Sequence, residues 1–167
     1  MKKLLFLAMV GGLILVFGGV AFAGNTATQT VQFQAPQVNE IAVSGNPAKI
    51  ILDAPAAGDD FVEKTDASTT YSFSTNQASR KITGQITTGG DMPTATNLNI
   101  TLAAPGGTWT SAGKKDLSVA ATAQDLATGN AGSSKTKTIT YGFLASIAGG
   151  AVAVDSSRVV TLTLTAQ

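Results

Sequence analysis

Apolar and polar residues alternate in short runs from about residue 28 to the C-terminus of the chain. A period of two places alternate side chains on one face of a sheet, so the pattern predicts β-strands and leaves almost no helix signal after residue 23. About seven to nine short strands at this spacing predict an all-β fold, an immunoglobulin-like Greek-key β-sandwich. The apolar positions that mark the expected strands are Val31, Phe33 and Ala35; Ile41 and Val43; Ile50 and Leu52; Tyr71 and Phe73; Ile82 and Ile86; Leu98, Ile100 and Leu102; Leu117 and Val119; Ile139, Tyr141 and Phe143; and Val160, Leu162 and Leu164.

Three segments between these runs have the composition of connections. Ala54 to Ser68 is rich in Ala, Gly and Asp, and we expect a long crossover loop there that carries the chain from one sheet to the other. Asn76 to Ser79 is short enough for a hairpin turn. Gly129 to Lys137 is polar and predicts a further loop.

The first 23 residues have the pattern of a secretory signal peptide. Lys2 and Lys3 form a positive start, Leu4 to Val20 is apolar, and Ala21-Phe22-Ala23 offers small residues at a cleavage site. We therefore expect a signal helix at residues 1–23, cleavage before Gly24 and a single domain at residues 24–167. The alternative is an uncleaved membrane anchor, because the apolar stretch approaches the roughly 20 residues that span a bilayer.

Composition narrows the range of functions. Two of the eleven basic residues lie in the signal, which leaves nine against ten acidic residues in the mature chain, so no nucleic-acid partner is expected. The chain has no cysteine, and an exported domain of this kind must be stable without disulfides or be completed by a partner. We expect a secreted or cell-surface protein that meets a membrane only through its signal peptide.

The absence of histidine and cysteine removes most catalytic constellations, including Ser-His-Asp triads, thiolate nucleophiles and the usual zinc ligands. Four carboxylates crowd one expected loop, but a glycosidase needs its acids aimed across a cleft. We therefore expect no enzyme and no cofactor. The same carboxylates are a weak candidate for a calcium site, against the alternative of solvated loop charge, since no EF-hand spacing is present. They are Asp59, Asp60, Glu63 and Asp66.

Trp109 is the single tryptophan and follows the turn Pro105-Gly106-Gly107. Near a loop tip, its ring is a candidate for surface contact with a sugar or a protein. The alternative is a core residue that closes one end of the sandwich.

Three pieces of the chain share a pattern of alternating strands interrupted by turn residues. They are TQTVQFQAPQVNEIAVSGNP at Thr28–Pro47, TTYSFSTNQASRKITGQI at Thr69–Ile86 and SSRVVTLTLTAQ at Ser156–Gln167. These pieces resemble the alpha-fimbrial (CS1-type) major pilins. The resemblance implies that an N-terminal extension leaves its own subunit and completes the immunoglobulin-like sandwich of the neighbour by donor-strand exchange. Residues 24–36 would then be the donor strand, with Val31, Phe33 and Ala35 as its inserted side chains and Pro36 near the hinge.

These observations lead us to expect an exported structural subunit of an extracellular filament, pilus or surface layer that assembles with copies of itself by β-strand addition. A periplasmic chaperone or another envelope assembly protein would be a second partner. Two alternatives remain open from the sequence. Val31 and Phe33 could form the first strand of their own sandwich, or the chain could be a monomeric secreted or surface adhesin that binds carbohydrate.

Overall fold

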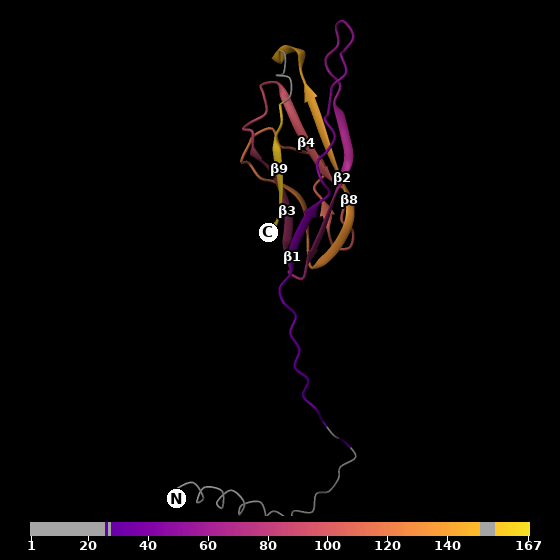
Figure 1. Cartoon of the computed structure of the whole chain (residues 1–167), viewed down its shortest axis with the longest axis vertical. Coiled ribbons are helices and arrows are strands. Elements are labelled where there is room, and N and C mark those ends of the chain that lie inside the picture. The colour runs from indigo at the N-terminus through magenta and orange to yellow at the C-terminus, as the bar shows by residue number, and fades with distance from the viewer. Residues whose placement is uncertain (1–25, 27, 151–155) are drawn as a thin grey trace, which may run out of the picture. The chain divides into compact units, whose positions relative to one another are not determined.

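A computed structural model describes residues 26, 28–150 and 156–167, and the expected signal peptide at residues 1–23 lies outside them. The chain divides into two units, Met1–Ala35 and Pro36–Gln167. All of the described strands lie in the second unit (Figure 1). No helix in the described part of the chain is long and apolar enough to cross a bilayer.

The strands form two antiparallel sheets, which confirms the predicted all-β class and is consistent with a β-sandwich. One short 3₁₀ turn, η1 (Ile147–Gly149), precedes the last strand. In spatial order the first sheet contains β1 (Asn39–Val43), β2 (Lys64–Thr75), β8 (Gly132–Ala145), β4 (Thr96–Leu102) and β6 (Lys115–Asp116). The second sheet contains β5 (Thr110–Ser111), β7 (Gln124–Gly129), β3 (Arg80–Thr88) and β9 (Val159–Ala166).

Both sheets contribute apolar side chains to a single core. The alternation along each strand explains which residues belong to the core, because every second side chain of a strand points to the same face of the sheet. In β3 the buried positions are Ile82, Gly84 and Ile86, and the residues between them, Thr83 and Gln85, are less buried. The largest fully buried side chains are those of Tyr71, Ile82, Ile86, Ile100, Leu102, Leu117, Leu126 and Ile139.

The connections differ from the predicted ones. The short turn Asn76–Ser79 is not a hairpin, because β2 belongs to the first sheet and β3 to the second. The segment Ala54–Ser68 does not change sheets, because β1 and β2 pair with each other, and its last residues from Lys64 onward belong to β2. Alternation specifies which face of a strand is buried, whereas the choice of partner strand depends on long-range packing.

Some strand boundaries were also wrong. The polar stretch Gly129–Lys137 is mostly strand, since β7 ends at Gly129 and β8 begins at Gly132. Its polar side chains are tolerated because one face of an antiparallel sheet can meet water. No strand forms at Ile50–Leu52 or at Leu117–Ala123, although Leu117 is buried in the core.

Candidate assembly surface

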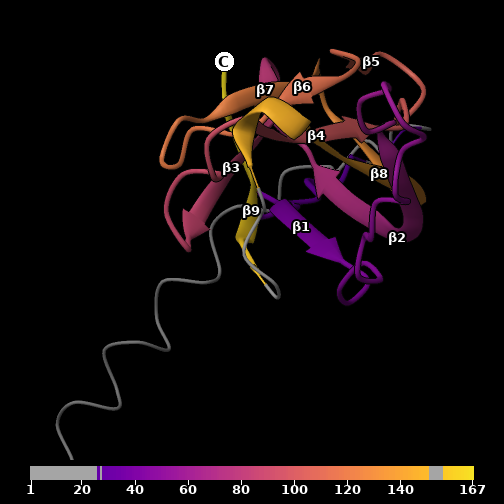
Figure 2. The same ribbon diagram turned by 90° about the horizontal axis from the view of Figure 1, so that it is seen from above.

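One side of the sandwich presents two strand edges that have no partner strand in the described part of the chain. β1 is the terminal strand of the first sheet and pairs with β2, while β9 is a terminal strand of the second sheet and pairs with β3. β1 and β9 lie side by side without being paired (Figure 2). An unpaired strand edge presents a row of N–H and C=O groups that can template another strand.

The direction of the backbone groups on β9 follows from two hydrogen bonds. The Gln167 N–H donates to the Ser79 carbonyl at 3.0 Å. The backbone N–H and C=O groups of the odd-numbered residues of β9 therefore point toward β3. The Leu164 carbonyl faces the other way and accepts a bond from Asn39 Nδ2 at 3.0 Å. Because backbone groups alternate along a strand, those of Val160 and Leu162 also point away from β3.

The same reasoning applies to β1. The Ser44 N–H donates to the Thr70 carbonyl at 2.9 Å. The backbone N–H and C=O groups of the even-numbered residues of β1 therefore point toward β2. The backbone groups of Ile41 and Val43 therefore point away from β2, on the side where β9 lies.

Apolar side chains line the space between these edges. Ile41, Val160 and Leu162 pack against the core but are only partly buried, and Val43 is 53% exposed. We call these four residues the β1–β9 seam. Leu164, near the C-terminal end of β9, is only 7% exposed. The core is thus incompletely covered along the seam.

On the opposite side the sheets end in the short strands β6 and β5. The Ala112 N–H bonds the Leu126 carbonyl and the Leu117 N–H bonds the Leu98 carbonyl, each at 2.8 Å, so the chain after β4 is fastened to both sheets. Leu117, which belongs to this segment, is buried in the core. On that side a bonded segment covers part of the core, whereas no backbone–backbone hydrogen bond joins β1 to β9 in the described part of the chain.

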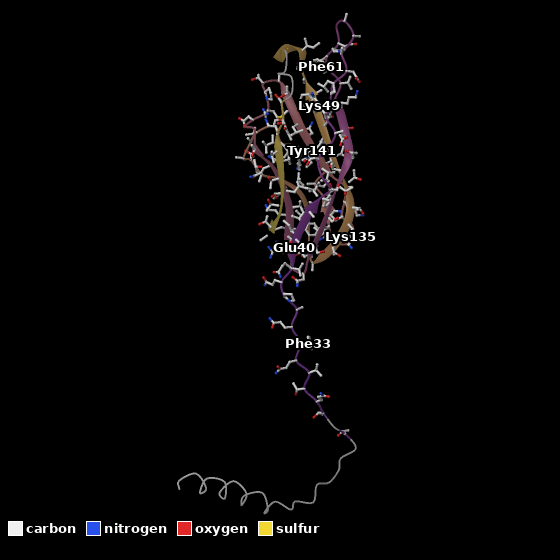
Figure 3. The ribbon with its side chains drawn as sticks, viewed as in Figure 1. Phe33, Glu40, Lys49, Phe61, Lys135 and Tyr141 are labelled. Carbon is white, nitrogen blue, oxygen red and sulfur yellow. The ribbon has the colours of Figure 1, made fainter. Side chains whose placement is uncertain are left out.

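The three expected donor residues lie on a segment without regular structure. Between residues 28 and 38 there is no strand, and the first strand begins at Asn39. Val31 is 71% exposed, and Ala35 is also exposed. Phe33, labelled in Figure 3, is 93% exposed. A phenylalanine this exposed gains nothing from the hydrophobic effect. In this structure Val31 and Phe33 do not form the first strand of their own sandwich.

The chain becomes fixed immediately after this segment. The Asn76 side chain donates from Nδ2 to the Pro36 carbonyl at 2.8 Å and accepts the Val38 N–H at 2.9 Å. Pro36 is also the first residue of the second compact unit. Asn76 thus fastens the backbone at Pro36 and Val38 to the sandwich.

Trp109 lies in the core. It is 5% exposed, its ring centroid is 4.5 Å from that of Phe73 at an interplanar angle of 55°, and its Nε1 donates to the Asn130 carbonyl at 2.7 Å. The indole has no free face for a sugar or a protein. Its position corresponds to the second sequence interpretation, a core residue, and not to a surface contact.

The four calcium-candidate carboxylates do not converge. Asp60 accepts bonds from Ser146 Oγ, the Ile147 N–H and the Phe61 N–H, each at 2.8 Å, and these hydrogen bonds hold the pKa of Asp60 below its ordinary value. Asp66 instead accepts from Ser68. In the described residues, no group of three or more such side chains could hold a metal ion.

Glu63, the third of those carboxylates, bonds to β4 and to the residue before β6. It directly precedes β2, and its Oε1 accepts a bond from Asn99 Nδ2 of β4 at 2.9 Å while its Oε2 lies 2.5 Å from Lys114 Nζ, next to β6. The side chain crosses β8 at Gly142, where a Cβ atom would collide with Oε1. The sequence pattern gave no sign of this cluster, because its members are 36 and 51 residues apart.

This cluster predicts a pH dependence of stability. The hydrogen bonds from Lys114 and Asn99 lower the pKa of Glu63 below its ordinary value. A group with a lowered folded-state pKa stabilises the fold above its unfolded pKa, and that contribution is lost as the pH falls through the folded value. We expect Glu63→Gln to show a smaller loss of unfolding free energy than wild type when urea unfolding is compared at pH 7 and pH 3. An Asp59→Asn variant, which alters an exposed carboxylate of the preceding loop, should behave as wild type; equal losses in all three proteins would contradict the prediction.

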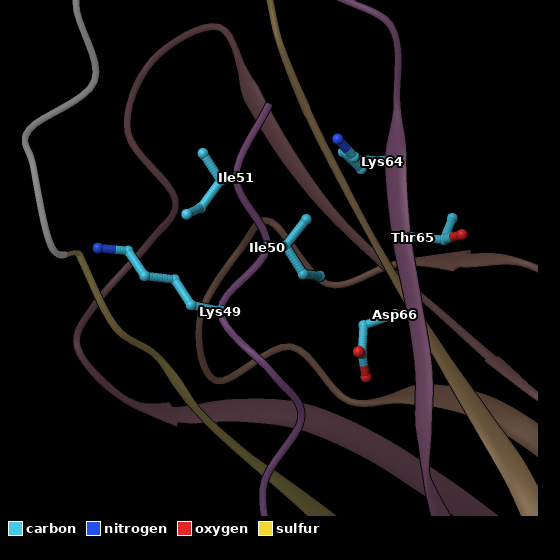
Figure 4. A pocket seen from close by; sticks show the side chains of 6 residues that line it. All are labelled: Lys49, Ile50, Ile51, Lys64, Thr65 and Asp66. Carbon is cyan, nitrogen blue, oxygen red and sulfur yellow. The ribbon is translucent and has the colours of Figure 1, made fainter. Parts of the chain in front are cut away.

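A shallow hollow lies between the segment Lys49–Ile51 and the start of β2, Lys64–Asp66 (Figure 4). At the edge of the hollow, Lys64 Nζ forms an ion pair with Asp53 Oδ2 at 2.6 Å. The hollow brings together one carboxylate, two lysines and aliphatic side chains. Two of these charged side chains are engaged with other groups, Lys64 with Asp53 and Asp66 with Ser68.

No family model matches this chain, and no curated protein matches it in sequence.

Proposed function

We propose that this protein is an exported structural subunit of an extracellular filament, pilus or surface layer. Its N-terminal segment, residues 24–36, would add as a β-strand to the β1–β9 seam of the next copy. The seam is the observation that carries the proposal, because it combines two free backbone edges with an incompletely covered apolar core. In this proposal the sandwich is immunoglobulin-like with Greek-key connections, and the added strand completes it.

The two parts fit in length and pattern. The described segment 28–35 has eight residues, the same number as β9, and eight residues of strand extend over roughly 26 Å. Val31, Phe33 and Ala35 share one face of such a strand, so all three would point into the seam. Backbone bonds would supply affinity, and the inserted side chains would set the register.

The proposal also accounts for the state of the free chain. Fully burying one Val or Phe side chain contributes about 1.5–3 kcal/mol, and both residues are exposed in the single chain. Insertion into a second copy is head-to-tail, and a head-to-tail contact that does not close into a ring produces a filament. Before assembly, a chaperone or another envelope protein could cover the open seam.

Export and a location at the cell surface rest on the signal pattern of residues 1–23. The absence of cysteine is compatible with this location, because strand addition supplies the stabilisation that disulfides give to many exported domains.

The test is negative-stain electron microscopy of the mature chain, residues 24–167, beside a version that lacks residues 24–36. We expect filaments from the mature chain and none after the deletion. Filaments from both proteins would contradict the N-terminal donor. Monomers in both would contradict spontaneous assembly and favour the alternative, a monomeric secreted or surface adhesin of the carbohydrate-binding kind, unless a helper protein restored the filaments.

A further inference from the structure

The Asn39 side chain reaches from β1 to the edge of β9 that faces away from β3. Its Nδ2 donates to the Leu164 carbonyl at 3.0 Å, between residues 125 positions apart. That carbonyl points away from β3, into the place where a strand added to β9 would present its own N–H. The Asn39 amide therefore occupies the bonding position of a missing strand.

The bond divides the edge into a fastened part and an open part. At the fastened end, Leu164 is 7% exposed. Toward the other end of β1, Val43 is 53% exposed, and the outward backbone groups of Val160 and Leu162 have no partner strand in the described part of the chain. A strand that pairs along β9 could bond the backbone N–H and C=O groups of Val160 and Leu162. The Leu164 carbonyl already accepts the bond from Asn39.

We propose that Asn39 is a latch of the free subunit: its amide covers the Leu164 carbonyl and is displaced when the N-terminal segment of a second copy pairs along β9. This inference rests on the proposed function. Strand addition would begin at the open end, near Val43 and Val160, and reach Leu164 last. In the free subunit the latch satisfies a backbone acceptor that would otherwise face a gap, and it shortens the edge available to a wrong partner.

Removing the latch should speed assembly. If the bond must break before pairing is complete, its loss lowers the barrier by the net contribution of one hydrogen bond, which corresponds to a rate increase of roughly fivefold. Asn39→Ala removes the amide, and Asn39→Asp keeps its shape but replaces the donor with a carboxylate that cannot donate to a carbonyl. Both variants leave the apolar lining of the seam unchanged.

Two other asparagines provide controls. Asn76→Ala also removes side-chain bonds to the backbone, at Pro36 and Val38, but none to β9, so it reports the effect of a general loss of bonding. Asn46→Ala changes an exposed asparagine of the loop after β1. Neither control is expected to assemble faster than wild type.

The experiment measures the assembly rate of the full mature chain by light scattering, with filaments checked by electron microscopy and folding by circular dichroism. Acceleration of about fivefold in Asn39→Ala and Asn39→Asp, without acceleration in the two controls, would support the latch. Wild-type filaments with unchanged or slower assembly of folded Asn39 variants would overturn the latch alone. Failure of every protein, wild type included, to assemble would overturn the latch together with the proposed strand addition.

Discussion

Replacing Trp109 with alanine is expected to lower the free energy of unfolding by about 3–5 kcal/mol. The indole is 5% exposed, packs against Phe73 and donates a hydrogen bond to the Asn130 carbonyl. It also lies directly on Gly129, where a Cβ atom would be 2.5 Å from the indole Cγ and Cδ2. The substitution therefore leaves a cavity and an unpaired backbone acceptor at the same place.

Urea unfolding of the subunit without residues 24–36 measures this effect apart from assembly, and Thr108→Ala, at the exposed neighbouring position, is the matched control. We expect the control to stay within about 0.5 kcal/mol of the parent. A loss below about 1 kcal/mol in Trp109→Ala would mean that the indole does not close this side of the core.

Phe33→Asp is expected to abolish assembly while leaving the folding of the subunit unchanged. Phe33 is 93% exposed and lies outside the compact unit Pro36–Gln167, so the single chain loses no packing. In the proposed filament the same position is buried in the seam, where the variant would lose the burial of a phenyl ring and would place a carboxylate among apolar side chains. Together these effects should weaken subunit association by more than about a hundredfold, since each 1.4 kcal/mol is a factor of ten.

Gln32→Asp is the matched control, because it introduces the same charge one residue away, on the opposite face of the strand. Sedimentation of assembled material would measure both variants. We expect Gln32→Asp to form filaments and Phe33→Asp to remain in the supernatant. Equal loss in both would indicate a general effect of charge on the segment, and equal assembly would exclude Phe33 as an inserted side chain.

The seam and the N-terminal segment each leave apolar side chains exposed to water. The segment exposes Val31 and Phe33. The sandwich leaves Ile41, Val160 and Leu162 only partly buried beside two unpaired edges. In the proposed filament, one contact with a second copy would bury both sets of side chains. This complementarity is the physical argument for assembly, and it does not depend on the family resemblance.

The alternation of apolar and polar residues by itself determined the all-β class and the core-facing positions of β3, β4 and β9, among them Ile82, Ile100 and Leu164. Period-two alternation is a local property of the chain, so it can be read without knowing any partner strand. It also identified Val31, Phe33 and Ala35 as one face of an extended segment. It failed for residues 133–137, where a polar stretch continues β8 because the sheet face there meets water.

Only the tertiary structure decided which strands are neighbours. It assigned β2 and β3 to different sheets across the short Asn76–Ser79 turn, made β1 and β9 free edges, buried Trp109, and brought Glu63 to Asn99 and Asn39 to Leu164. Each of these outcomes depends on contacts between residues far apart in the chain. A strand's own sequence specifies its faces, but its edges are paired or left free by the packing of the whole domain.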